Sequence, residues 1–131
     1  MEEQKAITQM GGTMRLGSYS CQLQPDSITA AIYGTTEISE RHRHRYEFNN
    51  EYLEIFEQAG MTPAGKNLKT NLVEIMELKD HPFYVGVQFH PEYKSTVENP
   101  HPLFVSFIKA AKDAHEKRNE FSKRPLEKSA L

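Results

Sequence analysis

Two polar side chains close together in the sequence could carry out acid–base chemistry. His90 and Glu92 are separated only by Pro91 and follow an apolar run at residues 83–89. This spacing lets the Glu92 carboxylate accept a hydrogen bond from one ring nitrogen of His90, which would fix the imidazole tautomer and leave the other nitrogen as a base. A solvated His-Pro turn without a chemical role would have the same sequence, so these residues alone leave both interpretations open.

The elements around this pair must present the imidazole. Residues 83–89 predict a buried strand, because the run is aromatic and β-branched and has turn residues on both sides. Pro91 cannot donate a backbone hydrogen bond, so we expect the strand to end at His90 and to present its ring at the carboxyl end. Residues 72–78 predict a second strand, and the turn at 80–82 makes the two an antiparallel pair.

The remaining pattern contains further short strands and helices. Helix caps and helical spacing are the main signals, with Gly or Pro at the boundaries. We expect strands near residues 13–17 and 19–23, a helix at 28–33 capped by Ser27, a helix near 53–59 that ends at Gly60, and a helix that begins at Pro102. Residues 1–10 predict a loose leader, and 112–131 predict a charged helical segment followed by a disordered tail.

Composition excludes several classes of protein. A chain of 131 residues with a net charge of −2 fits one modest domain and disfavours binding to nucleic acid or to an anionic membrane. No apolar run approaches the roughly 20 residues of a membrane helix, and the first residues do not have the pattern of a signal peptide. The single cysteine, Cys21, permits no internal disulfide, which suits the cytoplasm.

Residues 41–45 form the run Arg-His-Arg-His-Arg. In an extended chain the three arginines share one face, and His42 and His44 share the other. Because like charges repel, we expect the arginine face to border water or a cleft. A solvated basic edge, a metal pair formed by His42 and His44 with a third ligand from His90 or Glu92, and a weak nucleic-acid site all fit this run.

Three stretches together resemble a known family. Residues 85–92 read Val-Gly-Val-Gln-Phe-His-Pro-Glu, residues 11–17 read Gly-Gly-Thr-Met-Arg-Leu-Gly, and residues 40–49 read Glu-Arg-His-Arg-His-Arg-Tyr-Glu-Phe-Asn. They resemble the class I glutamine amidotransferases, and within them the CTP synthase family. The similarity runs over residues 11–111 and implies the C-terminal part of a flavodoxin-like α/β domain, with a mixed sheet flanked by helices and without the nucleophile segment.

The resemblance also implies site residues. A Cys-His-Glu glutaminase needs a thiolate, an imidazole base and a carboxylate that orients the imidazole; His90 and Glu92 match the last two. The last arginine of the basic run contacts glutamine in the family and matches Arg45, with Arg43 as a second candidate. Cys21 matches a noncatalytic position, and its surroundings have no Gly-rich elbow. The resemblance therefore predicts no metal site here and no activity for this chain alone.

The family's reaction moves ammonia from glutamine to UTP. It uses ATP and Mg²⁺, with GTP as activator. Its ATP, UTP and CTP sites lie in an amino-terminal synthetase domain that these residues do not match. The resemblance further implies a homotetramer and a cytoplasmic location. Two other interpretations stay open from the residues: a noncatalytic binding module of glutaminase shape, and a small His-rich metal-binding protein.

Overall fold

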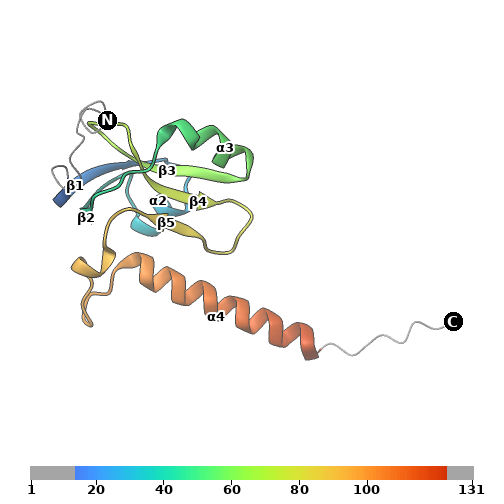
Figure 1. The fold of residues 1–131 in the computed structure, drawn as a ribbon. Helices are drawn as coiled ribbons and strands as arrows, with labels where there is room; N and C mark the ends of the chain where they lie inside the picture. Colours follow the sequence, from blue (N-terminus) through green and yellow to red (C-terminus); the bar gives the residue numbers. More distant parts are fainter. Residues whose placement is uncertain (1–13, 124–131) are drawn as a thin grey trace.

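The chain forms an antiparallel sheet with helices around it. The computed structural model describes residues 14–123, and among these the sheet is five-stranded in the order β2-β1-β3-β4-β5, antiparallel at every pair. Figure 1 shows the sheet curling, with α4 running out beyond it. The strands are β1 (Arg15–Leu23), β2 (Glu37–His44), β3 (Met61–Asn67), β4 (Val73–Leu78) and β5 (Val85–Val87). A mixed sheet is thus not formed by these residues.

Strand β1 is continuous, whereas the sequence predicted two short strands. It pairs with β2 along its length, from Arg15 opposite His44 to Gln22 opposite Glu37. Gly17 has a positive φ of 105° but does not end the strand, because β2 pairs with the residues before and after it. An uninterrupted partner strand therefore overrides the local turn signal.

The first helix begins and ends where capping chemistry predicts. The helix α2 (Ile28–Tyr33) is capped by Ser27, whose Oγ accepts a hydrogen bond from Ala30 N at 2.9 Å, and it ends at Gly34 with φ 70°. Three further helical segments follow, η1 (Asn50–Tyr52), α3 (Leu53–Gln58) and η2 (Pro91–Lys94), before the long helix α4 (Pro102–Lys123). The expected leader at 1–10 and the end of the expected tail, 124–131, lie outside the described residues.

The strand expected at residues 83–89 is shorter and less buried than predicted. The antiparallel pairing with β4 is confirmed, but β5 spans only Val85–Val87, and of the expected strand only Phe89 is buried. Gln88 N still donates to Glu74 O of β4 at 2.9 Å, but His90 N donates to Arg41 O of β2 at 2.9 Å, so the chain leaves β4 between Gln88 and His90. His90 therefore lies three residues beyond the strand, and it is not at the carboxyl edge of a parallel sheet.

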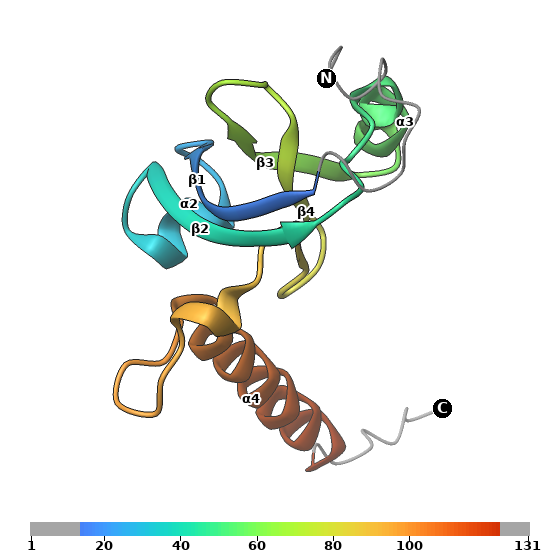
Figure 2. The ribbon, with the colours of Figure 1, turned by 60° about the vertical axis from the view of Figure 1, so that its left-hand side comes forward.

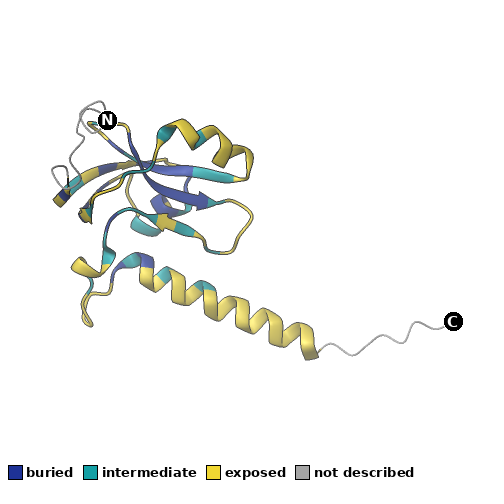
Figure 3. Cartoon of the chain, viewed as in Figure 1, coloured by how far each residue is buried: buried dark blue, intermediate teal, exposed yellow. Residues whose placement is uncertain are grey.

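A small apolar core lies between the sheet, α2 and the start of α4. Its buried members are Cys21, Leu23, Ala30, Ile38, Ala64, Ile75, Phe89 and Leu103. The strands approach closely at Gly65, where an added Cβ would lie 2.8 Å from Cys21 Sγ and 2.8 Å from Ile75 Cδ1. In α4 only Leu103 is buried, and Figure 3 shows the rest of that helix exposed or half-buried.

Candidate functional site

His90 and Glu92 form the hydrogen bond that their spacing predicts. His90 Nδ1 lies 2.7 Å from Glu92 Oε1. A carboxylate oxygen only accepts, so Nδ1 carries the proton and the neutral ring keeps a lone pair on Nε2. No hydrogen bond to Nε2 is made within residues 14–123, and the hydrogen bond from His90 holds the pKa of Glu92 below its usual value. The pair is thus an imidazole with a fixed tautomer and a free basic nitrogen.

The turn that carries this pair is attached to the free edge of β2. His90 N donates to Arg41 O at 2.9 Å, and Lys94 Nζ donates to the carbonyl oxygen of Ser39. The next residue inward, Phe89, is buried. In Figure 2 the chain passes from β5 beside β2 into η2 and then into α4. Because it uses edge carbonyls that the sheet leaves unpaired, the turn places His90 beside the basic strand.

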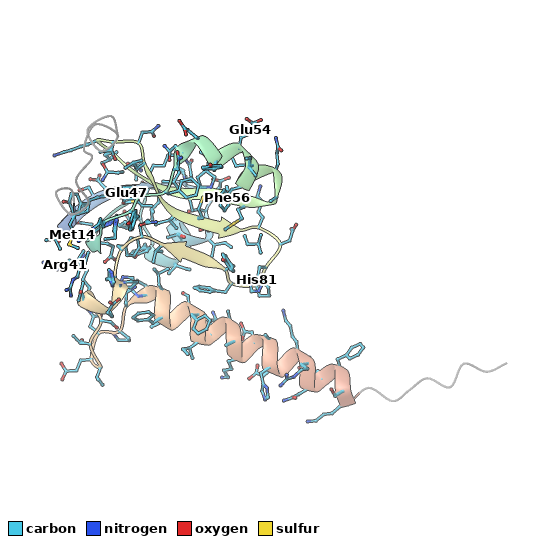
Figure 4. All side chains as sticks on the ribbon, in the orientation of Figure 1. Met14, Arg41, Glu47, Glu54, Phe56 and His81 are labelled. Atoms are coloured by element: carbon cyan, nitrogen blue, oxygen red, sulfur yellow. The ribbon has the colours of Figure 1, made fainter. Side chains whose placement is uncertain are left out.

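An open cavity of about 680 Å³ lies next to this turn. It is lined by Leu16, Gly17, Arg41, His42, Arg43 and Tyr93. The Tyr93 ring packs 5.3 Å from the ring of His90, and Arg41 projects outward from the fold (Figure 4). The cavity lining therefore combines two arginines with the aromatic Tyr93 next to the candidate base, which suits a small ligand with a carboxylate.

The two arginines expected to bind substrate differ in position. Arg43 lines the cavity, as the alternation of β2 predicts. Arg45 is exposed and lies just beyond the end of β2, and it is not among the residues that line the cavity. Its contact with substrate stays a prediction.

The other face of β2 is buried and polar, which the sequence did not indicate. His42 is 2% exposed, and its Nδ1 lies 2.7 Å from His44 Nε2. Burial, together with the nearby Arg15, His44 and His90, lowers the pKa of His42 to about 3. Since the two imidazoles bind each other, they do not form an open metal pair, and within residues 14–123 no group of three or more metal-ligating side chains comes together.

A buried ion-pair network supports the two histidines. Arg15 Nη2 donates to Glu74 Oε1 at 2.6 Å, and Arg15 Nη1 lies 3.3 Å from both carboxylate oxygens of Glu47. Asn67 Nδ2 also donates to Glu74 Oε1, at 3.1 Å, while Glu74 Oε2 lies 3.7 Å from His42 Nε2. The sequence analysis missed Arg15 and Glu74; the available signal was that an inward histidine face on β2 requires buried polar partners.

A second buried cluster attaches α4 to β2. Glu40 Oε1 accepts from Tyr33 OH at 2.8 Å and lies 2.7 Å from His101 Nε2. Burial and the adjacent Glu40 raise the pKa of Tyr33. None of these three residues lines the cavity, so the cluster serves to fix the residue before α4.

The only cysteine is a core residue. Cys21 is 0% exposed and packs against Gly65, and burial followed by the charge of Glu74 raises the pKa of its thiol. A neutral, buried thiol is a poor nucleophile. This agrees with the expectation that Cys21 is noncatalytic.

No helix among residues 14–123 is long and apolar enough to cross a membrane.

The sequence matches the family "Glutamine amidotransferase class-I" over residues 1–110. It is 66% identical over 111 residues to the CTP synthase of Christiangramia forsetii, a match that covers 85% of this chain and 20% of the relative. It is 64% identical over 113 residues to the CTP synthase of Cytophaga hutchinsonii, a match that covers 86% of this chain and 21% of the relative. The chain thus spans about a fifth of these relatives.

Two solved structures have a similar fold. The glutaminase domain of Trypanosoma brucei CTPS, with bound acivicin, superposes with a TM-score of 0.76 at 37% identity, covering 82% of this chain and 43% of that one. A Thermoplasma acidophilum protein assigned to GMP synthase shares the fold, with a TM-score of 0.57 at 22% identity over 82% of this chain and 49% of that one. The chain is similar to part of the glutaminase domain of CTP synthases, and it belongs to the class-I glutamine amidotransferase family.

Proposed function

We propose that His90 is the general base and acid of a glutaminase and that Glu92 orients it. The observation that carries this proposal is the 2.7 Å contact between His90 Nδ1 and Glu92 Oε1. In such a site the free Nε2 takes the proton of a cysteine thiol, and the thiolate attacks the side-chain amide of glutamine. His90 then protonates the departing ammonia, and water releases glutamate.

We further propose that arginines of the basic run bind the α-carboxylate of glutamine. Arg45 is the first candidate because it matches the family's glutamine contact, and Arg43 is the second because it lines the cavity beside Tyr93. A guanidinium can bind a carboxylate through two parallel hydrogen bonds, which fixes the orientation of the amino acid. Glutamine would then lie with its side-chain amide toward His90.

The wider reaction is inferred from the family. We propose that ammonia released here is used for the ATP-dependent amination of UTP to CTP, with Mg²⁺ and with GTP as activator, in a cytoplasmic homotetramer with a synthetase domain. Residues 14–123 bring together no group of three or more side chains that could hold a metal ion. We therefore place the Mg²⁺ site, with the ATP, UTP and CTP sites, in the synthetase domain, and we place the present sheet within a larger flavodoxin-like mixed sheet.

The experiment that tests this proposal compares two nitrogen sources. In the full-length enzyme carrying these residues, Glu92→Gln should lower glutamine-dependent product formation by about 10²- to 10⁴-fold, because the wrong tautomer or orientation of His90 disables the base. Formation from free ammonia should stay near wild type. Glu98, in the loop before α4, provides the matched control: Glu98→Gln should change neither rate. Equal loss of both activities in Glu92→Gln would overturn the proposal.

A further inference from the structure

We propose that His44 is a positioning residue that holds the backbone around Arg45. This inference rests on the proposed role of Arg45 in binding glutamine. His44 Nδ1 lies 2.9 Å from the carbonyl oxygen of Tyr46. A carbonyl oxygen only accepts, so Nδ1–H is the donor. The hydrogen bond closes a loop that contains one intervening residue, Arg45, at the point where β2 ends.

A second hydrogen bond, from His42, fixes the ring of His44. When Nδ1 donates to Tyr46, the uncharged imidazole presents Nε2 as an acceptor, and His42 Nδ1 lies 2.7 Å from it. His42 is buried, and the centroid of its ring lies 5.4 Å from that of Tyr19 and 5.9 Å from that of Phe89. The hydrogen bond from His44 to the carbonyl of Tyr46, which we call the clasp, is therefore connected to the core through His42. The core residue Phe89 also directly precedes His90.

A second attachment holds the far side of Arg45. Arg15 contacts both oxygens of Glu47 at 3.3 Å and also donates to Glu74 at 2.6 Å. The side chains of Arg15, Glu47 and Glu74 are 9%, 6% and 0% exposed. Hydrogen bonds between ionised groups are stronger than neutral ones, so His44, Tyr46 and Glu47 form a hydrogen-bonded frame on both sides of the exposed Arg45.

The hydrogen-bonded frame should lower the entropy cost of binding glutamine. A long arginine side chain on a free loop loses backbone and rotamer freedom when it binds a carboxylate, and this loss weakens affinity. A loop that is already fixed loses only the rotamer freedom. Since the contact would be made with glutamine and not with free ammonia, the clasp should affect the KM for glutamine far more than the ammonia-dependent rate.

Substitutions at His44 separate the clasp from general packing. The side-chain amide nitrogen of asparagine occupies the place of imidazole Nδ1, whereas that of glutamine occupies the place of Nε2. We therefore expect His44→Gln and His44→Ala to raise the KM for glutamine about 5- to 10-fold, the equivalent of one hydrogen bond. His44→Asn should stay within about 2-fold of wild type. Ammonia-dependent rates and thermal midpoints identify any variant that is simply misfolded.

A double-mutant cycle in the full-length enzyme decides the proposal. If His44 acts through Arg45, His44→Gln should have no further effect on the KM in an Arg45→Ala background. Independent, additive effects would overturn the positioning role, as would equal KM values for His44→Gln and His44→Asn. If Arg45→Ala itself leaves the KM unchanged, the proposed binding role of Arg45 fails first, and the clasp has no substrate contact to position.

Discussion

His90 donates its backbone N–H to the carbonyl of Arg41 at 2.9 Å, which joins the turn carrying the candidate base to the basic strand. The two residues are far apart in sequence and come together because β2 is an edge strand with free carbonyls. The same strand displays Arg43 to the cavity and buries His42 beneath it. One edge strand thus links the proposed base, the proposed carboxylate-binding residues and their buried support.

Arg45→Lys tests whether the planar guanidinium matters. Lysine keeps the positive charge but cannot form two parallel hydrogen bonds to a carboxylate. We expect the KM for glutamine to rise about 10-fold in Arg45→Lys, with ammonia-dependent activity unchanged in steady-state assays of the full-length enzyme. A lysine variant with the wild-type KM would show that Arg45 contributes charge alone.

Stability should fall with acidification because of His42. Its pKa is about 3 in the folded chain against an ordinary value of 6.5, so between these values the unfolded state binds more protons. The stabilisation is complete above about pH 6.5 and is lost as the pH falls toward 3, with a slope of at most about 1.4 kcal/mol per pH unit for one proton. Urea denaturation at pH 7, 6 and 5 measures this decrease in the free energy of unfolding.

The matched variant for that experiment is His42→Asn. It removes the titrating group, so its unfolding free energy should depend less steeply on pH than that of the wild type over the same range. Parallel curves for the two proteins would mean that His42 takes up its proton equally in the folded and unfolded states.

Part of this site follows from sequence because it depends on local chemistry. The hydrogen bond from His90 to Glu92 spans two residues, the Ser27 cap lies at the start of its helix, and the alternation of β2 separates Arg43 from His42. Each feature depends on neighbouring residues, whose geometry the sequence restricts strongly.

The remainder depends on partners distant in the chain. Arg15 meets Glu74 across 59 positions, and this network lies beneath the buried His42 face of the basic run, for which a solvated edge was one interpretation. The strand expected at 83–89 is shortened because the chain leaves β4 after Gln88 and His90 bonds to Arg41 of β2. Pairings over such separations are set by the assembled sheet and not by propensity.

Removing Arg15 should destabilise the fold more than removing an exposed partner of an ion pair. Arg15→Met leaves Glu74 buried with its charge uncompensated, and we expect a loss of about 3–5 kcal/mol. Lys112 provides the control, because it pairs with Glu116 at 3.9 Å on the exposed face of α4. Lys112→Met should cost less than about 1 kcal/mol in the same denaturation experiment. Similar losses in both variants would show that the Arg15 network is not structurally important.

The final prediction concerns the 131 residues by themselves, which we expect to release no glutamate from glutamine. Their only thiol belongs to Cys21, which is 0% exposed and whose pKa is raised by burial, so neither access nor ionisation permits attack on an amide. An alkylating reagent should therefore modify Cys21 slowly in the native chain and rapidly in urea. Loss of the nucleophile alone removes nearly all of a triad's rate enhancement. Glutamate release by the purified chain that is abolished in Cys21→Ser would show that Cys21 reaches His90 after all.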